Sequence, residues 1–278
     1  MKDKESYFIS LFKSKKIGDD GAIVDDIVYS ADLFCEDIHF KREWMSLKEI
    51  AYKAMLVNIS DAIVMNAKVK YALISIKIPK EFSKPELKEL SEGFKKASKE
   101  FSFEIIGGDT VAGDKLDISI MLISKLLGKA IRRYGLELGD LLGFTGELGS
   151  VKRDLDRLFS GKNVDKNSKF IKPILKDKFF FKASPFISSA LDISDGLSKE
   201  LSRLSTINEI GFEFFDRFDD KNKEIMCSGE EYEILFSCKK EYKEKLEEIA
   251  KKTDTKITFF AKAIKGRYNT ICKENHFE

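Results

Sequence analysis

Leu191-Asp192-Ile193-Ser194-Asp195-Gly196-Leu197 is a short apolar segment that ends in an acidic turn, and the same design occurs five times along this chain. The other four segments are Ile17-Gly18-Asp19-Asp20, Ser30-Ala31-Asp32, Asn58-Ile59-Ser60-Asp61 and Gly107-Gly108-Asp109-Thr110. Each one alone has a structural explanation, because Asp and Gly form turns and Ser or Asp caps helices. Taken together, they predict that aspartates at the ends of several strands meet at one edge of a sheet.

The segments between these turns alternate between the period of a strand and the period of a helix. We expect strands at Ile27–Ala31, Tyr71–Ile78, Leu116–Leu126, Leu141–Thr145, Ser189–Ile193, Gly211–Phe215, Tyr232–Cys238 and Ile257–Ile264. We expect helices at Leu47–Ala62, Pro85–Phe101, Arg153–Phe159, Leu197–Leu204 and Glu241–Lys252. The mixture predicts an α/β (α+β) fold. A chain of 278 residues favours two domains, which we place at residues 1–130 and 131–278. The lysine-rich stretch 161–182 is interpreted as a solvated excursion.

Charge and hydropathy narrow the class of partner. Lys and Arg total 49 against 47 Asp and Glu, so the formal net charge is only +2 and a nucleic-acid partner is not indicated. No apolar run approaches the roughly 20 residues of a membrane span, and the N-terminus lacks the apolar core of a secretion signal. The sequence therefore predicts a protein without a membrane partner, located in the cytoplasm.

The cysteines and histidines exclude several kinds of site. Cys35, Cys227, Cys238 and Cys272 lie far apart without CxxC spacing, which predicts reduced packing residues rather than a disulfide framework or a zinc site. Two histidines are too few for a His-rich metal site. Any chemistry here must therefore rest on carboxylates, backbone groups and cations.

Convergent carboxylates indicate a particular cation. Crowded aspartates raise one another's pKa, whereas Mg²⁺ accepts carboxylate oxygens and keeps waters for substrate phosphates. Glycine-rich turns with free N–H groups complete a cradle for Mg·ATP. The P-loop, the dinucleotide-binding glycine motif, the protein-kinase motifs and the EF-hand loop are all absent from the sequence. A phosphate-binding enzyme would need another architecture.

Eight motifs in order resemble the thiamine-monophosphate kinase family. They are IGDD (17–20), SADLFCEDIHF (30–40), AYKAMLVNISDAIVMNA (51–67), IIGGDT (105–110), RRYGLELGD (132–140), FTGELG (144–149), LDISDGL (191–197) and SGEEYEILF (228–236). The resemblance implies ATP-dependent phosphorylation of thiamine phosphate to thiamine diphosphate, with several Mg²⁺ ions. It also implies an aminoimidazole-ribonucleotide-synthetase-like fold whose N-terminal domain binds ATP and Mg²⁺ and pairs across a homodimer, followed by a C-terminal α/β domain.

The resemblance also assigns roles to single residues. The implied metal ligands are Asp20, Ser30, Ala31, Asp32, Asp61, Asp109, Asp192 and Asp195. The implied ATP contacts are Gly108, Asp109, Arg133 and Ser194, with Asp109 and Arg133 as catalytic residues. Contacts to thiamine phosphate are implied for His39 and Glu230. Because the acceptor is a phosphate oxygen that is already ionised near neutral pH, the reaction needs alignment and charge neutralisation rather than a strong general base.

Competing explanations accompany these assignments. His39 could instead be a packed or surface histidine, and Glu230 could lie on a solvated acidic face. Arg133 could form a surface pair with Glu137. The sequence departs from the family pattern at Ala31, where threonine is common, at Asn66, which replaces a glycine, and at Ser228 and Glu231 within the SGEEYE motif. Near the C-terminus, Asn275-His276-Phe277 resembles the family ending, but Glu274 replaces an aromatic residue that packs on the thiamine ring.

Two other functions remain open at this point. One is another ATP-using member of the superfamily, such as the ribonucleotide cyclase or a selenophosphate synthetase, the latter using a reactive cysteine. Cys35, within SADLFCEDIHF, is the first cysteine of this chain. The other is a nucleotide-binding protein that has lost turnover, which the departures at Ala31 and Glu274 suggest.

Overall fold

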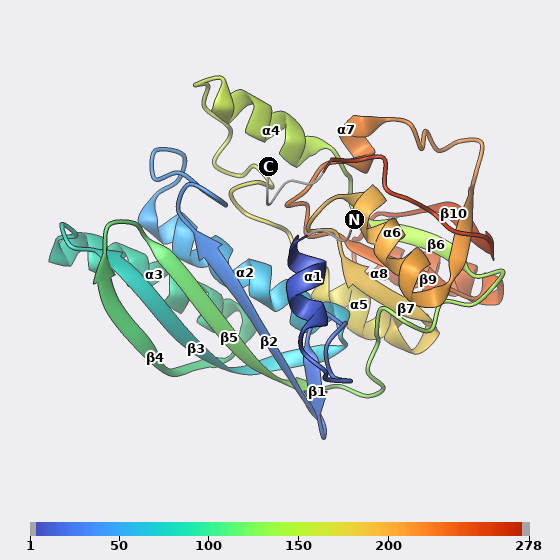
Figure 1. The fold of residues 1–278 in the computed structure, drawn as a ribbon, viewed down its shortest axis with the longest axis horizontal. Helices are drawn as coiled ribbons and strands as arrows, with labels where there is room; N and C mark the ends of the chain where they lie inside the picture. Colours follow the sequence, from blue (N-terminus) through green and yellow to red (C-terminus); the bar gives the residue numbers. More distant parts are fainter. Residues whose placement is uncertain (1–3, 274–278) are drawn as a thin grey trace.

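The computed structural model describes residues 4–273, which form two five-stranded sheets with helices packed on them (Figure 1). The first sheet has the order β1-β2-β5-β3-β4. Its strands are β1 (Ala22–Val24), β2 (Ile27–Cys35), β3 (Ala67–Pro79), β4 (Glu104–Gly113) and β5 (Asp117–Leu126). Only β3 and β4 pair in parallel, because helix α3 (Lys84–Phe101) provides the crossover between them.

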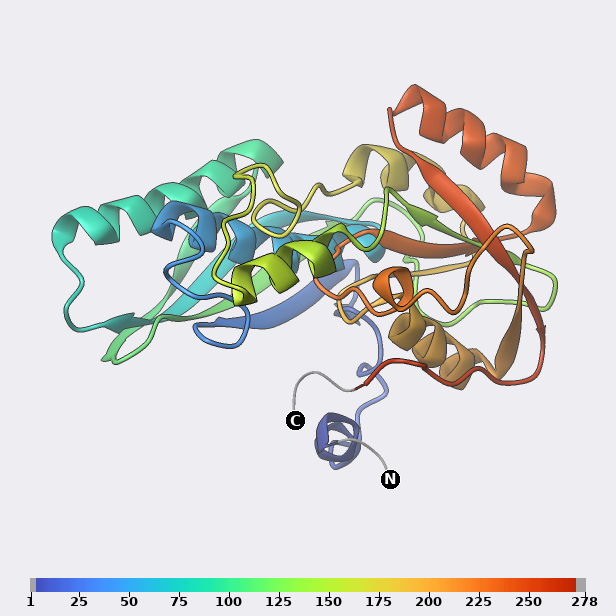
Figure 2. The same cartoon turned by 90° about the horizontal axis from the view of Figure 1, so that it is seen from above.

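Helices α2 (Leu47–Val64) and α3 cover one face of this sheet and leave the other face open (Figure 2). Both helices begin with a capping box, in which a serine side chain accepts a backbone N–H and a glutamate three residues later returns a hydrogen bond. The open face carries exposed apolar side chains, among them Leu33, Tyr71 and Met121. An apolar sheet face of this kind is typical of a surface that binds a partner.

The second sheet has the order β7-β9-β6-β10-β8, and all its pairs are antiparallel. Its strands are β6 (Leu141–Thr145), β7 (Ser189–Asp192), β8 (Ile210–Phe214), β9 (Ile234–Cys238) and β10 (Ile257–Lys265). The remaining helices are α1 (Lys4–Ser10), α4 (Ser150–Phe159), α5 (Asp177–Ala183), α6 (Leu197–Asn208), α7 (Lys223–Met226) and α8 (Lys243–Lys252), with 3₁₀ turns at Ser184–Phe186 and Lys240–Tyr242. Helices α6 and α8 cover opposite faces of this sheet (Figure 2).

Helix α2 lies between the two halves and is buried almost all round. It contacts β2, β3 and β5 of the first sheet as well as β7 and α5 of the C-terminal half. One apolar core therefore runs from Phe94 in α3, past α2, to Phe236 in β9. The proposed boundary at residue 130 falls between β5 and β6, and it stays a prediction.

The α/β fold class is confirmed, but three of the five acidic segments are not turns. Asp32 lies inside β2, Asp61 lies in the last turn of α2, and Gly107-Gly108-Asp109-Thr110 belongs to β4. For the last segment, the prediction of a turn was wrong because Gly also occurs within strands where two backbones approach closely. At Gly108, a Cβ atom would lie only 1.7 Å from the carbonyl oxygen of Ile74, so β3 requires glycine opposite it.

The interpretation of residues 161–182 as a solvated excursion fits residues 161–169, none of which is fully buried, but was wrong for the part that follows. Phe170, Phe179 and Phe180 are fully buried in the shared core. Lys169 binds the buried carboxylates of Glu231 and Glu233. The many lysines suggested a solvated segment, but its buried aromatic side chains anchor it between the two halves.

The prediction that all four cysteines are reduced was wrong for two of them. Cys227 and Cys272 form a disulfide that closes a loop across a sequence separation of 45 residues, while Cys35 and Cys238 are free. Spacing in the sequence could not indicate this pair, because β9, α8 and β10 separate its members. Within residues 4–273, no helix is long and apolar enough to cross a membrane. Glu274 and the Asn275-His276-Phe277 motif lie outside the described residues.

Candidate active site

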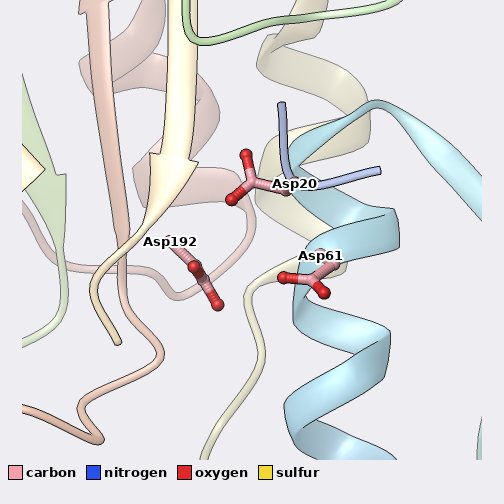
Figure 3. A group of neighbouring side chains, drawn as sticks. All are labelled: Asp20, Asp61 and Asp192. Carbon is pink, nitrogen blue, oxygen red and sulfur yellow. The ribbon is translucent and has the colours of Figure 1, made fainter. Parts of the chain in front are cut away.

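Asp20, Asp61 and Asp192 form an acidic cluster between the two halves of the molecule. One carboxylate oxygen from each lies within 4.8 Å of the others, and the three side chains point into a common space (Figure 3). They come from a loop before β1, the last turn of α2 and the end of β7. The predicted convergence therefore occurs, but at a helix between two sheets rather than along one sheet edge.

Asp32 joins this cluster from the middle of β2. Because side chains alternate along a strand, Ser30 and Asp32 point toward α2, whereas Ala31 points to the open face of the sheet. The Asn58 side chain accepts a hydrogen bond from the backbone N–H of Asp32 at 3.1 Å, which fixes β2 against α2. The Ser30 hydroxyl is buried without a hydrogen-bond partner, so it has lone pairs for a ligand.

The carboxylates raise one another's pKa. Burial, followed by the charges of Asp20 and Glu230, raises the pKa of Asp32 to about 6. Burial and the neighbouring charges of Asp32 and Asp192 raise the pKa of Asp61 well above its usual range, and burial and Asp20 do the same for Asp192. Asp61 also lies at a helix C-terminus, where the helix dipole disfavours negative charge. These groups therefore favour the binding of a cation.

Arg133 places a positive charge beside the acidic cluster. Its Nη2 lies 2.6 Å from Asp20 Oδ1, and its Nε donates to Oδ2 at 3.3 Å. Burial lowers the pKa of Arg133, but Asp20, whose side chain is only 1% exposed, more than offsets this effect and raises it. The alternative surface pair with Glu137 does not form, because Glu137 faces Lys239 instead.

In the LDISDGL segment, Asp192 belongs to the acidic cluster, while Ser194 and Asp195 make contacts outside it. Ser60 donates a 2.7 Å hydrogen bond to Asp192, so α2 holds this carboxylate in place. Asp195 instead pairs with Arg203 of α6, beside the buried Glu200. The backbone carbonyl of Ser194 accepts from the N–H of Glu230 at 2.7 Å. The segment thus connects the acidic cluster to the SGEEYE loop.

His39 and Glu230 lie in the same region, beside the acidic cluster. His39 stacks on Phe34, and its Nδ1 accepts from the backbone N–H of Cys35 at 3.0 Å. Glu230 is not a solvated acid, because its carboxylate contacts the fully buried Lys53 and accepts a hydrogen bond from Tyr232 at 2.9 Å. Burial raises the pKa of Glu230, but Lys53 and then His39 outweigh burial and lower it.

The sequence reasoning missed the side chains that hold this loop. Glu230 and Tyr232 both have positive φ, at 59° and 48°, a conformation that non-glycine residues adopt at a cost and often at functional sites. Lys169 holds the loop in place by binding Glu231 and Glu233. Lys53, which lies within the apolar sequence of α2, could have indicated such a partner. A helix that is buried on all sides must pair its charged side chains.

Gly108 and Asp109 lie apart from the cluster. Asp109 is exposed on edge strand β4, in register with Ser75, Ser119 and then Leu33 across the sheet. A shallow hollow of about 190 Å³ on the open face is lined by these residues together with Ile76, Lys77, Val111 and Asp117. Three strand spacings separate Asp109 from β2, about 14 Å, so its carboxylate does not reach the cluster of its own chain.

The donor set suits magnesium. Carboxylate and hydroxyl oxygens are the ligands that Mg²⁺ prefers, and the cluster offers only such groups from Asp20, Asp32, Asp61, Asp192 and Ser30. The raised pKa values and the unpartnered Ser30 hydroxyl both fit a bound cation. A Mg²⁺ ion held by these residues would neutralise the negative charge of bound phosphate groups.

The N-terminal half of the chain is similar to aminoimidazole-ribonucleotide (AIR) synthase: the family model described as "AIR synthase related protein, N-terminal domain" matches residues 18–126. Thiamine-monophosphate kinase of Buchnera aphidicola subsp. Schizaphis graminum is 31% identical over 271 residues, which cover 88% of this chain and 83% of that protein. The Bacillus subtilis enzyme is 32% identical over 222 residues, covering 72% and 66%. The chain belongs to the thiamine-monophosphate kinase family, as its motifs predict.

A solved structure supports the same fold. The structure titled "AaThiL complexed with AMPPCP and TMP" superposes with a TM-score of 0.85 at 23% sequence identity, covering 97% of this chain and 94% of that one. The likeness extends over both sheets, so the two-sheet arrangement is the arrangement of that protein.

Proposed function

We propose that this protein transfers the γ-phosphoryl group of ATP to thiamine phosphate and releases thiamine diphosphate and ADP. The observation that carries the proposal is the acidic cluster of Asp20, Asp32, Asp61 and Asp192 beside Glu230, in a chain of the thiamine-monophosphate kinase family. AaThiL has been solved with AMPPCP and TMP, which supports the same pair of substrates here.

The residues of this chain divide the reaction between them. The carboxylates of Asp20, Asp32, Asp61 and Asp192, with Ser30, hold several Mg²⁺ ions. Arg133 lies beside Asp20, where its guanidinium can bind a phosphate oxygen of ATP near Ser194. His39 and Glu230 bind the acceptor. The acceptor phosphate already carries the attacking oxygen as an anion, so the chain needs no strong base.

The direct test is product formation. The protein is incubated with ATP, Mg²⁺ and thiamine phosphate, and thiamine diphosphate and ADP are separated and quantified. We expect equal amounts of both products, none in EDTA, and loss of turnover in Asp61→Asn but not in Asp114→Asn, whose carboxylate is exposed. ATP binding without thiamine diphosphate in the wild type would favour a nucleotide-binding protein that has lost turnover.

We further propose a homodimer in which the open face of the first sheet meets its counterpart. Leu33, Tyr71 and Met121 would be buried there. Asp109 lies on this face, too far from its own cluster, so we infer that Gly108 and Asp109 serve the ATP of the partner. Asp195, which pairs with Arg203, would bind a further cation on the outer side.

Mixing two inactive variants tests this arrangement. Asp61→Asn and Asp109→Asn are each expected to be inactive alone. Random mixing makes half of the dimers mixed, and one of their two sites is intact, so about a quarter of the wild-type activity should return. No recovery from subunits shown to exchange would place Asp109 in the site of its own chain, and an Asp109→Asn variant that is active alone would place it outside the mechanism.

We also propose that the protein functions in the cytoplasm, without a nucleic-acid or membrane partner. The Cys227–Cys272 disulfide is unusual for that compartment, where thiols are kept reduced. Alkylation of thiols at the moment of cell lysis tests the location. Four alkylated cysteines would fit the cytoplasm, and two would indicate an oxidising compartment.

A further inference from the structure

Lys53 is a fully buried lysine on α2, two helical turns before Asp61, and its partners come from three distant segments. Its Nζ lies 2.9 Å from Glu230 Oε2. The same Nζ lies 3.8 Å from the ring centre of Phe170 and 5.7 Å from that of Phe34. One ammonium group therefore connects α2, the end of β2, the 161–182 segment and the SGEEYE loop.

Such a residue needs a reason, because removing a lysine from water is costly unless the charge is paired. Burial lowers the pKa of Lys53, and the carboxylate of Glu230 opposes that shift. The two charged atoms lie 2.9 Å apart, so the ammonium group compensates the charge of Glu230 at close range. An apolar side chain would pack between Phe34 and Phe170 at lower cost.

The geometry around Glu230 indicates what the lysine does. Tyr232 donates to one carboxylate oxygen of Glu230 and Lys53 contacts the other, while the Glu230 N–H binds the carbonyl of Ser194. The side chain is therefore fixed in position and direction. Each oxygen retains a lone pair, so the carboxylate can still accept a hydrogen bond from a ligand.

We propose that Lys53 is a positioning residue for the phosphoryl acceptor: it holds Glu230 as a correctly oriented anion that receives a donor group of thiamine phosphate. This inference rests on the proposed function and adds a residue to it. Lys53 does not touch the substrate itself, because its side chain is fully enclosed. Lys53 and Glu230 are not among the residues proposed to hold ATP or Mg²⁺, so the KM for ATP should respond less than the KM for thiamine phosphate.

The test is Lys53→Met, which keeps the length of the side chain and its packing between the two aromatic rings but removes the charge. Lys96→Met is the matched control, because Lys96 Nζ also lies 3.8 Å from an aromatic ring centre, that of Tyr52, away from the site. Steady-state kinetics are measured separately for thiamine phosphate and ATP. Lys53→Met should raise the KM for thiamine phosphate about tenfold or more, the effect of disturbing a hydrogen bond to a charged group, and leave the KM for ATP within about twofold.

Two further variants separate positioning from folding. Lys53→Arg keeps the charge and should return the KM for thiamine phosphate to within about threefold of wild type. Lys53→Met combined with Glu230→Gln removes both charges, so it should recover the melting temperature while the high KM persists.

Three results would overturn the proposal: an unchanged KM for thiamine phosphate in Lys53→Met, an equal rise in both KM values, or a double variant in which stability and KM recover together. The last result would mean that Lys53 only offsets a buried charge. A wild-type protein that makes no thiamine diphosphate would instead refute the proposed function, and it is assayed first. In that case, calorimetric titration of the same variants with thiamine phosphate tests Lys53 alone.

Discussion

The acidic cluster makes a prediction about stability that is opposite in sign to the usual effect of a mutation. In the absence of Mg²⁺, Asp32→Asn should make the protein more stable at neutral pH, because it removes a carboxylate whose charge is disfavoured by burial and by the charges of Asp20 and Glu230. The substitution preserves the shape of the side chain. It also preserves the hydrogen bond that fixes β2, since that bond joins the backbone N–H of Asp32 to Asn58.

The magnitude follows from the pKa. Asp32 titrates near 3.8 when it is solvated and at about 6 in the folded protein, a difference of about 2 units. At 1.36 kcal/mol for each unit, ionisation of Asp32 costs the metal-free protein about 3 kcal/mol at pH 7.5. The cost is absent below pH 3.8, grows as the pH rises from 3.8 to 6, and is constant above that range. For a chain of this length, 3 kcal/mol corresponds to a rise in melting temperature of about 5 °C.

The assay is urea unfolding in EDTA, for wild type and variant, across the pH range from 4 to 7.5. We expect the advantage of Asp32→Asn to be greatest at pH 7.5 and to disappear toward pH 4, while Asp114→Asn follows the wild type. Adding Mg²⁺ should stabilise the wild type more than the variant. A variant that is equal to or less stable than wild type at pH 7.5 in EDTA would refute the electrostatic reasoning.

Two further predictions concern the supports of the site. Cys227→Ser should lower the free energy of unfolding by up to about 4 kcal/mol in urea, the loop entropy of a 45-residue closure, and a reducing agent should have the same effect on the wild type and none on the variant. Lys169→Met should cost about 3–5 kcal/mol, because it leaves Glu231 and Glu233 buried without a cation, and the loss should shrink when both are also changed to Gln.

The fold could be predicted from the sequence where an element has a continuous apolar run, as β6 does, or one apolar face, as α3 does. Leu141–Thr145 was predicted with its correct bounds, and the helix from Pro85 differs from α3 by one residue. Strand β4 was missed because its residues are nearly all exposed and rich in glycine, so it has no alternating pattern. Its ladder with β3 defines it, and sequence periodicity does not contain that information.

The acidic residues of the site could be predicted for a different reason. Several aspartates in apolar surroundings have few explanations, so Asp20, Asp61 and Asp192 could be grouped before their positions were known. The separation of Asp109 from that group could not be predicted, because a motif does not state which side of a sheet its side chain faces. Lys53 and Lys169 were missed because a lysine is normally a surface residue, and only burial distinguishes these two from the other lysines.

The position of α2 explains why the site forms where it does. This helix belongs to the core of both halves, and its polar residues Lys53 and Asp61 face the C-terminal half at two levels. At one level an ammonium group meets Glu230 across the interface, and the charges attract. At the other level Asp61 meets Asp192, and the charges repel until a cation binds. Binding of Mg²⁺ should therefore tighten the packing of the two halves around α2, and the Lys53–Glu230 contact should be stabilised by the same event.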